Sequence, residues 1–362
     1  RAACKYSLAN DKPHNMKSLT KERIPMADWV KAFAIYLVVM SHTAIARPVA
    51  NWAFMVEIPL FFFMSGYLFR FRSNPSFSAF AKKRFRQIII PYITINTVTY
   101  LFWLLATRRF NADNAAIPAW QPLVGIITCR STLLHHNATM YFFTALFNIE
   151  ILYYLLFRKR KFSARCLITL LLAMLGAADY YLSPSELPFS ISHTLVGIVF
   201  YSLGYELRCS GVINTFMNSH STEGILTKAF AATAFFAASL LLMHLTGPLN
   251  LQKRIYDIYP LYFVEALLAI FSVITAFSIP SSLPQIIRQI SANTLWICGY
   301  HLLVFTLIKG FMIYIAGIPP TILDSRILPN ILFSLAAMLI CLCFAIIIKS
   351  LNKETKRFSF FL

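Results

Sequence analysis

Apolar stretches long enough to cross a lipid bilayer recur along almost the whole 362-residue chain. About 20 mostly apolar residues cross the hydrocarbon core as an α-helix, and irregular backbone is not tolerated in contact with lipid. Because 58% of the residues are hydrophobic and 13% are charged, an ordinary water-soluble globule is excluded. The sequence predicts an all-α, polytopic transmembrane helix bundle of about ten spans, over residues 28–46, 51–70, 88–106, 138–157, 166–183, 191–207, 228–246, 259–279, 293–315 and 328–349.

The distribution of Lys and Arg predicts how the helices are oriented. With both termini in the cytoplasm, 24 of the 33 Lys and Arg residues fall on the cytoplasmic side and 7 on the outer side. Cytoplasmic loops of membrane proteins carry such an excess of basic residues. The same loops, facing anionic lipids, account for the net charge of +19 without a nucleic-acid partner.

Both termini are therefore expected to be cytoplasmic. Reporter proteins fused after Leu362 test this, because an alkaline phosphatase is active outside the cytoplasm and a green fluorescent protein inside it. We expect fluorescence without phosphatase activity. The reverse pattern would contradict the orientation.

The chain divides into one membrane domain and two polar tails. Residues 1–22 form a polar tail with no apolar core, unlike a secretory signal, and Met16 is a plausible true start. Residues 23–350 form the integral-membrane domain, and residues 351–362 a basic cytoplasmic tail. No separate soluble domain is visible. The seven Cys residues show no metal-ligand spacing, so we predict neither a metal site nor a disulfide.

Ionisable residues within the first two spans mark a candidate functional site. The first span carries Asp28, Lys31 and His42, and the second carries Glu57. Such side chains are costly at membrane depth and by default face a cavity or the bundle interior. Lys31 and His42, eleven residues apart, share one helix face and lie roughly 16 Å apart along the axis. Glu57 lies at a depth comparable to His42, so its carboxylate is predicted to reach the imidazole. Alternatively, Lys31 snorkels to the interface and His42 bonds to neighbouring backbone.

Four segments in order resemble the acyltransferase 3 family of integral-membrane O-acyltransferases. Lys31 and His42 match that family's Lys or Arg, ten residues, then His. PLFFFMSGYLF (59–69) matches its FF-x-x-SG turn, followed by KKRFRQIIIPY (82–92). MYFFTALF (140–147) and SANTLWICGYH (291–301) resemble later segments, and the resemblance covers residues 20–350. Tyr141 stands where the family usually has Trp, and Glu57 where a fucose-acetylase-like branch tends to have His, which leaves the acceptor open.

The resemblance implies an O-acetyltransferase of the inner (plasma) membrane. Its donor would be cytosolic acetyl-CoA, used as a co-substrate rather than a bound cofactor, and its acceptor a sugar hydroxyl of a cell-surface or extracytoplasmic glycan or lipid-linked sugar. His42 would be the general base or carry an acetyl group, Glu57 would orient it, and Lys31, Asp28 and His301 would complete the catalytic set. Membrane lipids are the other expected partners.

Two further sets of residues are candidate binding groups. Lys82, Lys83, Arg84 and Arg86, together with Lys31, are predicted to hold the phosphates of coenzyme A, since Arg and Lys suit phosphate. Alternatively, these basic residues only set topology. In and after the segment 107–137, Trp120, Asn137 and Tyr141 are predicted to bind the acceptor sugar. Alternatively, this segment is an amphipathic stretch lying in the membrane interface.

Two other classes of protein fit the polar residues in the spans. A proton-coupled transporter also places His, Glu and Lys within spans, although it more often shows inverted repeats, and none is visible here. A non-catalytic glycan-handling membrane protein is the other alternative. Consumption of acetyl-CoA separates the enzyme from both.

Overall fold

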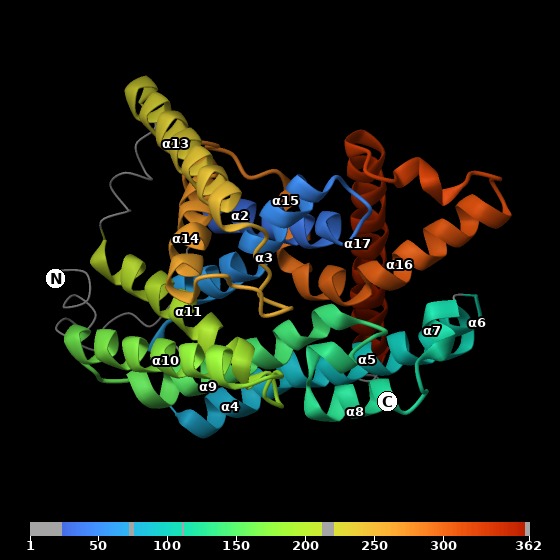
Figure 1. Ribbon diagram of the computed structural model, residues 1–362, viewed down its shortest axis with the longest axis horizontal. Coiled ribbons are helices and arrows are strands. Elements are labelled where there is room, and N and C mark those ends of the chain that lie inside the picture. The colour runs from blue at the N-terminus through green and yellow to red at the C-terminus, as the bar shows by residue number, and fades with distance from the viewer. Residues whose placement is uncertain (1–23, 72–75, 111, 212–220, 359–362) are drawn as a thin grey trace.

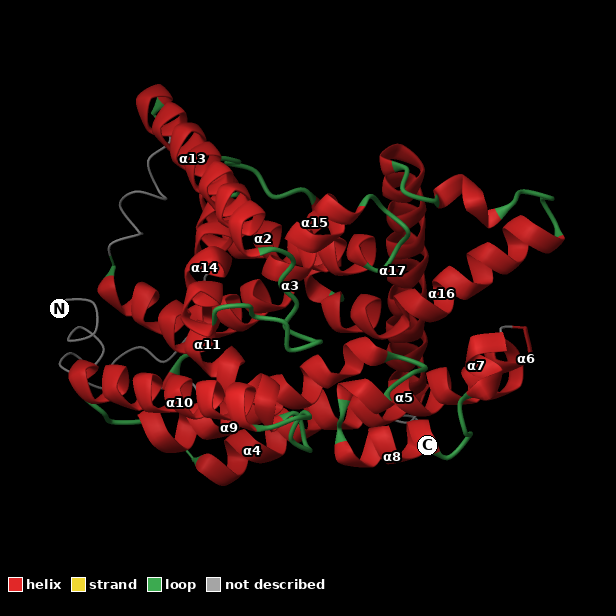
Figure 2. Ribbon diagram, viewed as in Figure 1, coloured by secondary structure: helices red, strands yellow, loops and turns green. Residues whose placement is uncertain are grey.

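The computed structural model describes residues 24–71, 76–110, 112–211 and 221–358, and in these residues it contains helices and no strand (Figures 1 and 2). The predicted tail at residues 1–22 lies outside the described residues. The helical content and the absence of strands in the described residues confirm the predicted all-α transmembrane helix bundle. The long helices are α2 (Pro25–Ser41), α3 (Arg47–Leu68), α9 (Tyr141–Phe157), α10 (Phe162–Leu182), α11 (Ile191–Ser210), α13 (Thr222–Thr246), α14 (Tyr259–Ala276), α16 (Thr294–Tyr314) and α17 (Ile327–Phe358).

A composite helix occupies the predicted span 88–106. It runs over Phe77–Thr107 as α4 (Phe77–Arg84), a π-helical turn η2 (Phe85–Ile89), α5 (Ile90–Phe102) and a second π-helical turn η3 (Trp103–Thr107). Pro91 lacks the N–H that would bond one turn back, which accounts for the altered turn before it. The helix therefore begins eleven residues earlier than predicted and carries the basic residues 82–86 on its first turns.

Eight helices in the described part of the chain are long and apolar enough to cross a membrane. The two predicted spans outside this group are α2, which has 17 residues, and α11, which carries several polar side chains. Both are strongly buried: Val30 and Ile35 of α2 and Phe200 of α11 are fully inaccessible. The count of about ten spans therefore stays a prediction.

Burial divides the helices into a central and a peripheral set. Of the most apolar window of each helix, 67% is buried in α3 and 56% in α9 and α14, against 11% in α10 and α13. In Figure 1, α13 lies alongside α14 at the edge of the molecule. Leu170, Met174 and Phe230 on these outer helices are exposed, as expected for side chains that face lipid. The central helices therefore hold the candidate site.

Helices α3 and α11 approach each other to backbone contact. A Cβ atom on Gly66 would lie 1.9 Å from the Tyr201 carbonyl oxygen, and one on Gly204 would lie 2.0 Å from the Phe63 carbonyl oxygen. Small residues permit such close packing of helices in membranes. The glycine of the FF-x-x-SG turn therefore serves helix packing.

The segment 107–137 folds back onto the composite helix. It forms the short helices α6 (Arg108–Phe110), α7 (Ala112–Ala116) and α8 (Gln121–Thr128). Tyr92 donates a hydrogen bond to the Ile126 carbonyl at 2.9 Å, and Tyr100 donates to the Ala119 carbonyl at 3.0 Å. These bonds hold the segment against the helix that precedes it.

Candidate active site

Two histidines predicted as catalytic lie side by side. His42 follows the last residue of α2, and its ring centroid is 5.3 Å from that of His301 on α16, in an edge-on arrangement. His42 Nδ1 lies 2.8 Å from the Val38 carbonyl oxygen, which only accepts, so Nδ1 carries the proton in the neutral ring. His42 Nε2 then holds the lone pair that a general base needs.

His301 repeats this arrangement deeper in the protein. Its Nδ1 donates to the Cys298 carbonyl at 2.9 Å, and its buried Nε2 has no hydrogen-bond partner. His301 is fully buried, whereas His42 is partly exposed. Of the two rings, His42 is the one that a substrate can reach.

Glu57 lies near the histidines but does not hold the imidazole. Its carboxyl group interacts with the Ser41 hydroxyl, which is 3.2 Å from His42 Nδ1. Among the described residues no hydrogen bond or ion pair joins Glu57 to His42. The Val38 carbonyl, one helical turn before His42, orients the ring instead. This differs from the predicted contact, because the carboxyl group points toward Ser41.

Asp28 and Lys31 lie at the opposite end of α2 from His42. Asp28 accepts a hydrogen bond from the Ser291 hydroxyl of α15 (Gln285–Ala292). Because roughly 16 Å of helix separates Lys31 from His42, Asp28 and Lys31 are too far away to contact the histidines. The predicted catalytic residues therefore fall into two groups, one at each end of α2.

A cavity of about 140 Å³ lies beside Lys31, among residues of α2, α3, the composite helix, α9 and α16. Its lining includes Ile58, which follows Glu57, and Cys298, whose carbonyl accepts from His301, while Glu57, His42 and His301 are not among the lining residues. The cavity is mostly apolar, and its lining is Lys31, Ile58, Phe61, Ser65, Ile88, Phe142, Phe143, Leu146, Thr294, Leu295 and Cys298.

The four basic residues of the composite helix are not equivalent. Arg84 Nε lies 2.6 Å from a carboxylate oxygen of Glu150, a buried residue of α9. Lys82, Lys83 and Arg86 are exposed. Arg84 is therefore engaged in an internal ion pair, and the other three present their charges at the surface.

The predicted sugar-binding residues are dispersed. Trp120, just before α8, is 63% exposed, whereas Tyr141 at the start of α9 is fully buried. The Tyr141 ring is 4.4 Å from the ring of His193 on α11, and its phenol lies within electrostatic range of Glu57. Of these residues, Tyr141 is the one that borders the histidine site.

Asn137 and the preceding His136 fasten their loop to the helices. The Asn137 amide donates to the Gly299 carbonyl at 2.7 Å, and its oxygen accepts from Thr139. His136 Nε2 donates to the Asn96 side-chain oxygen at 2.9 Å. Burial lowers the pKa of His136 to about 4, so the ring is neutral at neutral pH. These bonds account for the burial of Asn137 and place the loop beside α16.

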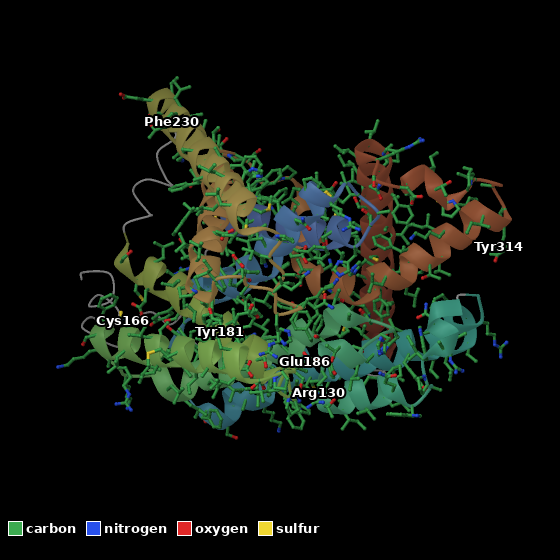
Figure 3. The ribbon with its side chains drawn as sticks, in the orientation of Figure 1. Arg130, Cys166, Tyr181, Glu186, Phe230 and Tyr314 are labelled. Carbon is green, nitrogen blue, oxygen red and sulfur yellow. The ribbon has the colours of Figure 1, made fainter. Side chains whose placement is uncertain are left out.

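Sequence reasoning missed a second group of residues around the site. Lys253, on the loop before α14, lies within electrostatic range of His42. Glu186, at the turn between α10 and α11, accepts hydrogen bonds from Ser131 and Thr132 and lies near the adjacent Arg130 (Figure 3). All of these belong to loops whose composition carries no distinguishing pattern, so no local signal separated them from other polar loop residues.

The candidate site residues lie within the part of the chain that matches a known protein family. The sequence model of the acyltransferase 3 family, described as an acyltransferase domain, matches residues 25–350. No curated protein and no solved structure matches the chain. The matched range includes Lys31, His42, Glu57 and His301 and covers nearly all of the chain. The chain is therefore a membrane protein of the acyltransferase 3 family.

Proposed function

We propose that this protein transfers an acetyl group from cytosolic acetyl-CoA to a sugar hydroxyl of a cell-surface or extracytoplasmic glycan, and that it acts in the inner (plasma) membrane. Membership of the family supports acyl transfer. The observation that carries the proposal is the pair of His42 and His301, because His42 Nε2 holds the lone pair of a general base. The nearby cavity, lined by Lys31 and by Cys298, whose carbonyl accepts from His301, offers space for a slender thioester arm.

The donor enters from the end of α2 that carries Lys31. Lys82, Lys83 and Arg86 offer exposed positive charge to the phosphates, and Lys31 attracts the donor at the inner end of the cavity. An engineered cavity of about 150 Å³ in another protein accommodates benzene, so the space here suits the acetyl thioester and not the nucleotide. The limited volume favours a short acyl group.

The chemistry follows from the free lone pair on His42. His42 Nε2 takes the proton of the acceptor hydroxyl as its oxygen attacks the thioester carbonyl carbon. The C–S bond then breaks, and the leaving sulfur receives that proton from His42, so the net reaction releases no proton. Attack by Nε2 itself, giving an acetyl-imidazole before transfer, uses the same atom.

Purified protein in lipid nanodiscs, incubated with radiolabelled acetyl-CoA and a panel of methyl hexosides, tests the function. We expect labelled acetyl-glycoside and stoichiometric free coenzyme A. A proton-coupled transporter or a non-catalytic glycan-handling protein would leave the thioester intact. Glycan analysis of a deletion strain then identifies the natural acceptor.

Changing Lys82, Lys83 and Arg86 together to Ala is expected to raise the KM for acetyl-CoA about tenfold, with kcat retained, because contacts to remote phosphates bind ground state and transition state alike. Steady-state kinetics at two salt concentrations check this, and the effect should shrink at high salt. Arg84 is left unchanged, since its removal would leave Glu150 buried and unpaired.

The matched control changes Lys159, Arg160 and Lys161 to Ala. These residues are also basic, exposed and on the predicted cytoplasmic side, but they lie between α9 and α10. We expect the control to leave the donor KM within about twofold. An equal rise in both triple variants would assign the basic residues to general membrane charge.

A further inference from the structure

Fifteen polar atoms on buried side chains have no hydrogen-bond partner among the described residues, and four of them, besides His301 Nε2, belong to side chains around the His42 and His301 pair. These four atoms are Glu57 Oε2, Tyr141 Oη, His193 Nδ1 and Tyr262 Oη. The four residues are at most 3% exposed. Buried polar atoms are nearly always bonded to protein or to ordered water, and an unsatisfied one is costly. A group of them is a candidate place for a polar molecule or for ordered water.

The four side chains come from four central helices. Glu57 comes from α3, Tyr141 from α9, His193 from α11 and Tyr262 from α14. The Tyr141 and His193 ring centroids are 4.4 Å apart. The phenols of Tyr141 and Tyr262 lie within electrostatic range of each other and of the Glu57 carboxyl group. Through Ser41, Glu57 adjoins His42. We call this group the polar cluster.

The loops that cover the polar cluster lie on the predicted outer side. His193 Nε2 donates to the Gln252 carbonyl at 3.1 Å, and Nδ1 is 3.8 Å from Glu186. The Ser131 hydroxyl lies 2.9 Å from Glu186 and 3.3 Å from the Gln252 carbonyl, so three loops meet here. The polar cluster is thus on the His42 side of the site, opposite the end where Lys31 lines the cavity.

We propose that the polar cluster is the acceptor subsite and binds a ring with several hydroxyl groups. This inference rests on the proposed function. Two phenols donate and accept, the Glu57 carboxyl group offers acceptor oxygens, and an imidazole nitrogen accepts, so together they match a polyhydroxylated ring from several directions. A monohydric alcohol satisfies one or two of these atoms and leaves the others unpaired. In this arrangement Glu57 orients the acceptor hydroxyl toward His42.

Tyr262→Phe tests the subsite, because it removes one oxygen and keeps the ring. The control is Tyr259→Phe on the same helix. The Tyr259 hydroxyl is also buried and unpartnered, but it lies against Gly176 of α10, where its electrostatic neighbours are Asp179 and Tyr181. It lies within range of Tyr262 as well, but not within range of Glu57 or Tyr141. Both variants are measured in nanodiscs with acetyl-CoA and either the best methyl hexoside of the panel or cyclohexanol as acceptor.

We expect Tyr262→Phe to raise the KM for the methyl hexoside about tenfold, the usual weight of one buried hydrogen bond, and to change the KM for cyclohexanol less than twofold. Tyr259→Phe should leave both constants within twofold. Equal effects of the two variants, or equal effects of Tyr262→Phe on the KM for sugar and for cyclohexanol, would overturn the subsite. An unchanged KM for the sugar would also overturn it and would mean that only structural water occupies the polar cluster. If the wild type uses cyclohexanol as well as any hexoside, this inference fails and acetyl transfer stands. If it consumes no acetyl-CoA, the proposed function fails as well.

Discussion

Replacing His42 by Ala is expected to lower the rate of acetyl transfer by a factor of about 10² to 10⁴, the usual contribution of a positioned general base. The variant loses the Nε2 lone pair that the Val38 carbonyl keeps available by binding Nδ1. His42 is partly exposed at the end of α2, so the fold is expected to persist. Initial rates at saturating acetyl-CoA and acceptor, with thermal unfolding as a check on folding, measure this.

His301→Ala and Glu57→Gln separate the roles of the neighbours. If His42→Ala retains near-normal transfer while His301→Ala loses it, then His301 is the base. Glu57→Gln preserves the side-chain shape, and the Val38 carbonyl still holds His42, so we expect a smaller loss than for His42→Ala. A larger loss for Glu57→Gln would make the carboxylate the proton acceptor.

Replacing Gly66 by Val is expected to prevent the folded protein from accumulating. The first added carbon would lie 1.9 Å from the Tyr201 carbonyl oxygen. Because both atoms belong to helix backbones, no side-chain rotation relieves the overlap, and α3 and α11 must separate. Overpacking of a core typically costs about 1–3 kcal/mol, and a clash between backbones is expected to cost more. Size-exclusion chromatography in detergent and the thermal unfolding midpoint measure the loss.

Gly310→Ala on α16 is the matched control. A Cβ atom there meets nothing within 4 Å, so the substitution should be neutral or slightly stabilising through helix propensity. Comparable yields of folded Gly66→Val and Gly310→Ala protein would contradict the close packing of α3 against α11.

The local sequence was sufficient to predict the positions of most helices and the relation between Lys31 and His42 in the candidate site. Hydropathy and length locate spans because the bilayer imposes the same requirement on every segment. The eleven-residue spacing predicted Lys31 near one end of a helix and His42 near the other, since that relation depends on helix geometry alone. In the structure α2 ends at Ser41, and His42 is the residue that follows it. The start of the composite helix was missed because residues 77–87 include four basic residues, which hide a helix that extends beyond the apolar span.

Tertiary structure decided which side chains meet. The contact of His301 with His42, the pairing of Arg84 with Glu150, and the polar cluster of Glu57, Tyr141, His193 and Tyr262 join residues from different helices. These contacts depend on the rotation of each helix about its axis and on the close approach at Gly66, neither of which hydropathy encodes. The sequence by itself therefore determined a membrane acyltransferase with Lys31 in the first part of one helix and His42 at its end. Packing alone decided which side chains surround Lys31 and His42, because the association of helices in lipid depends on the shape and polarity of their whole surfaces.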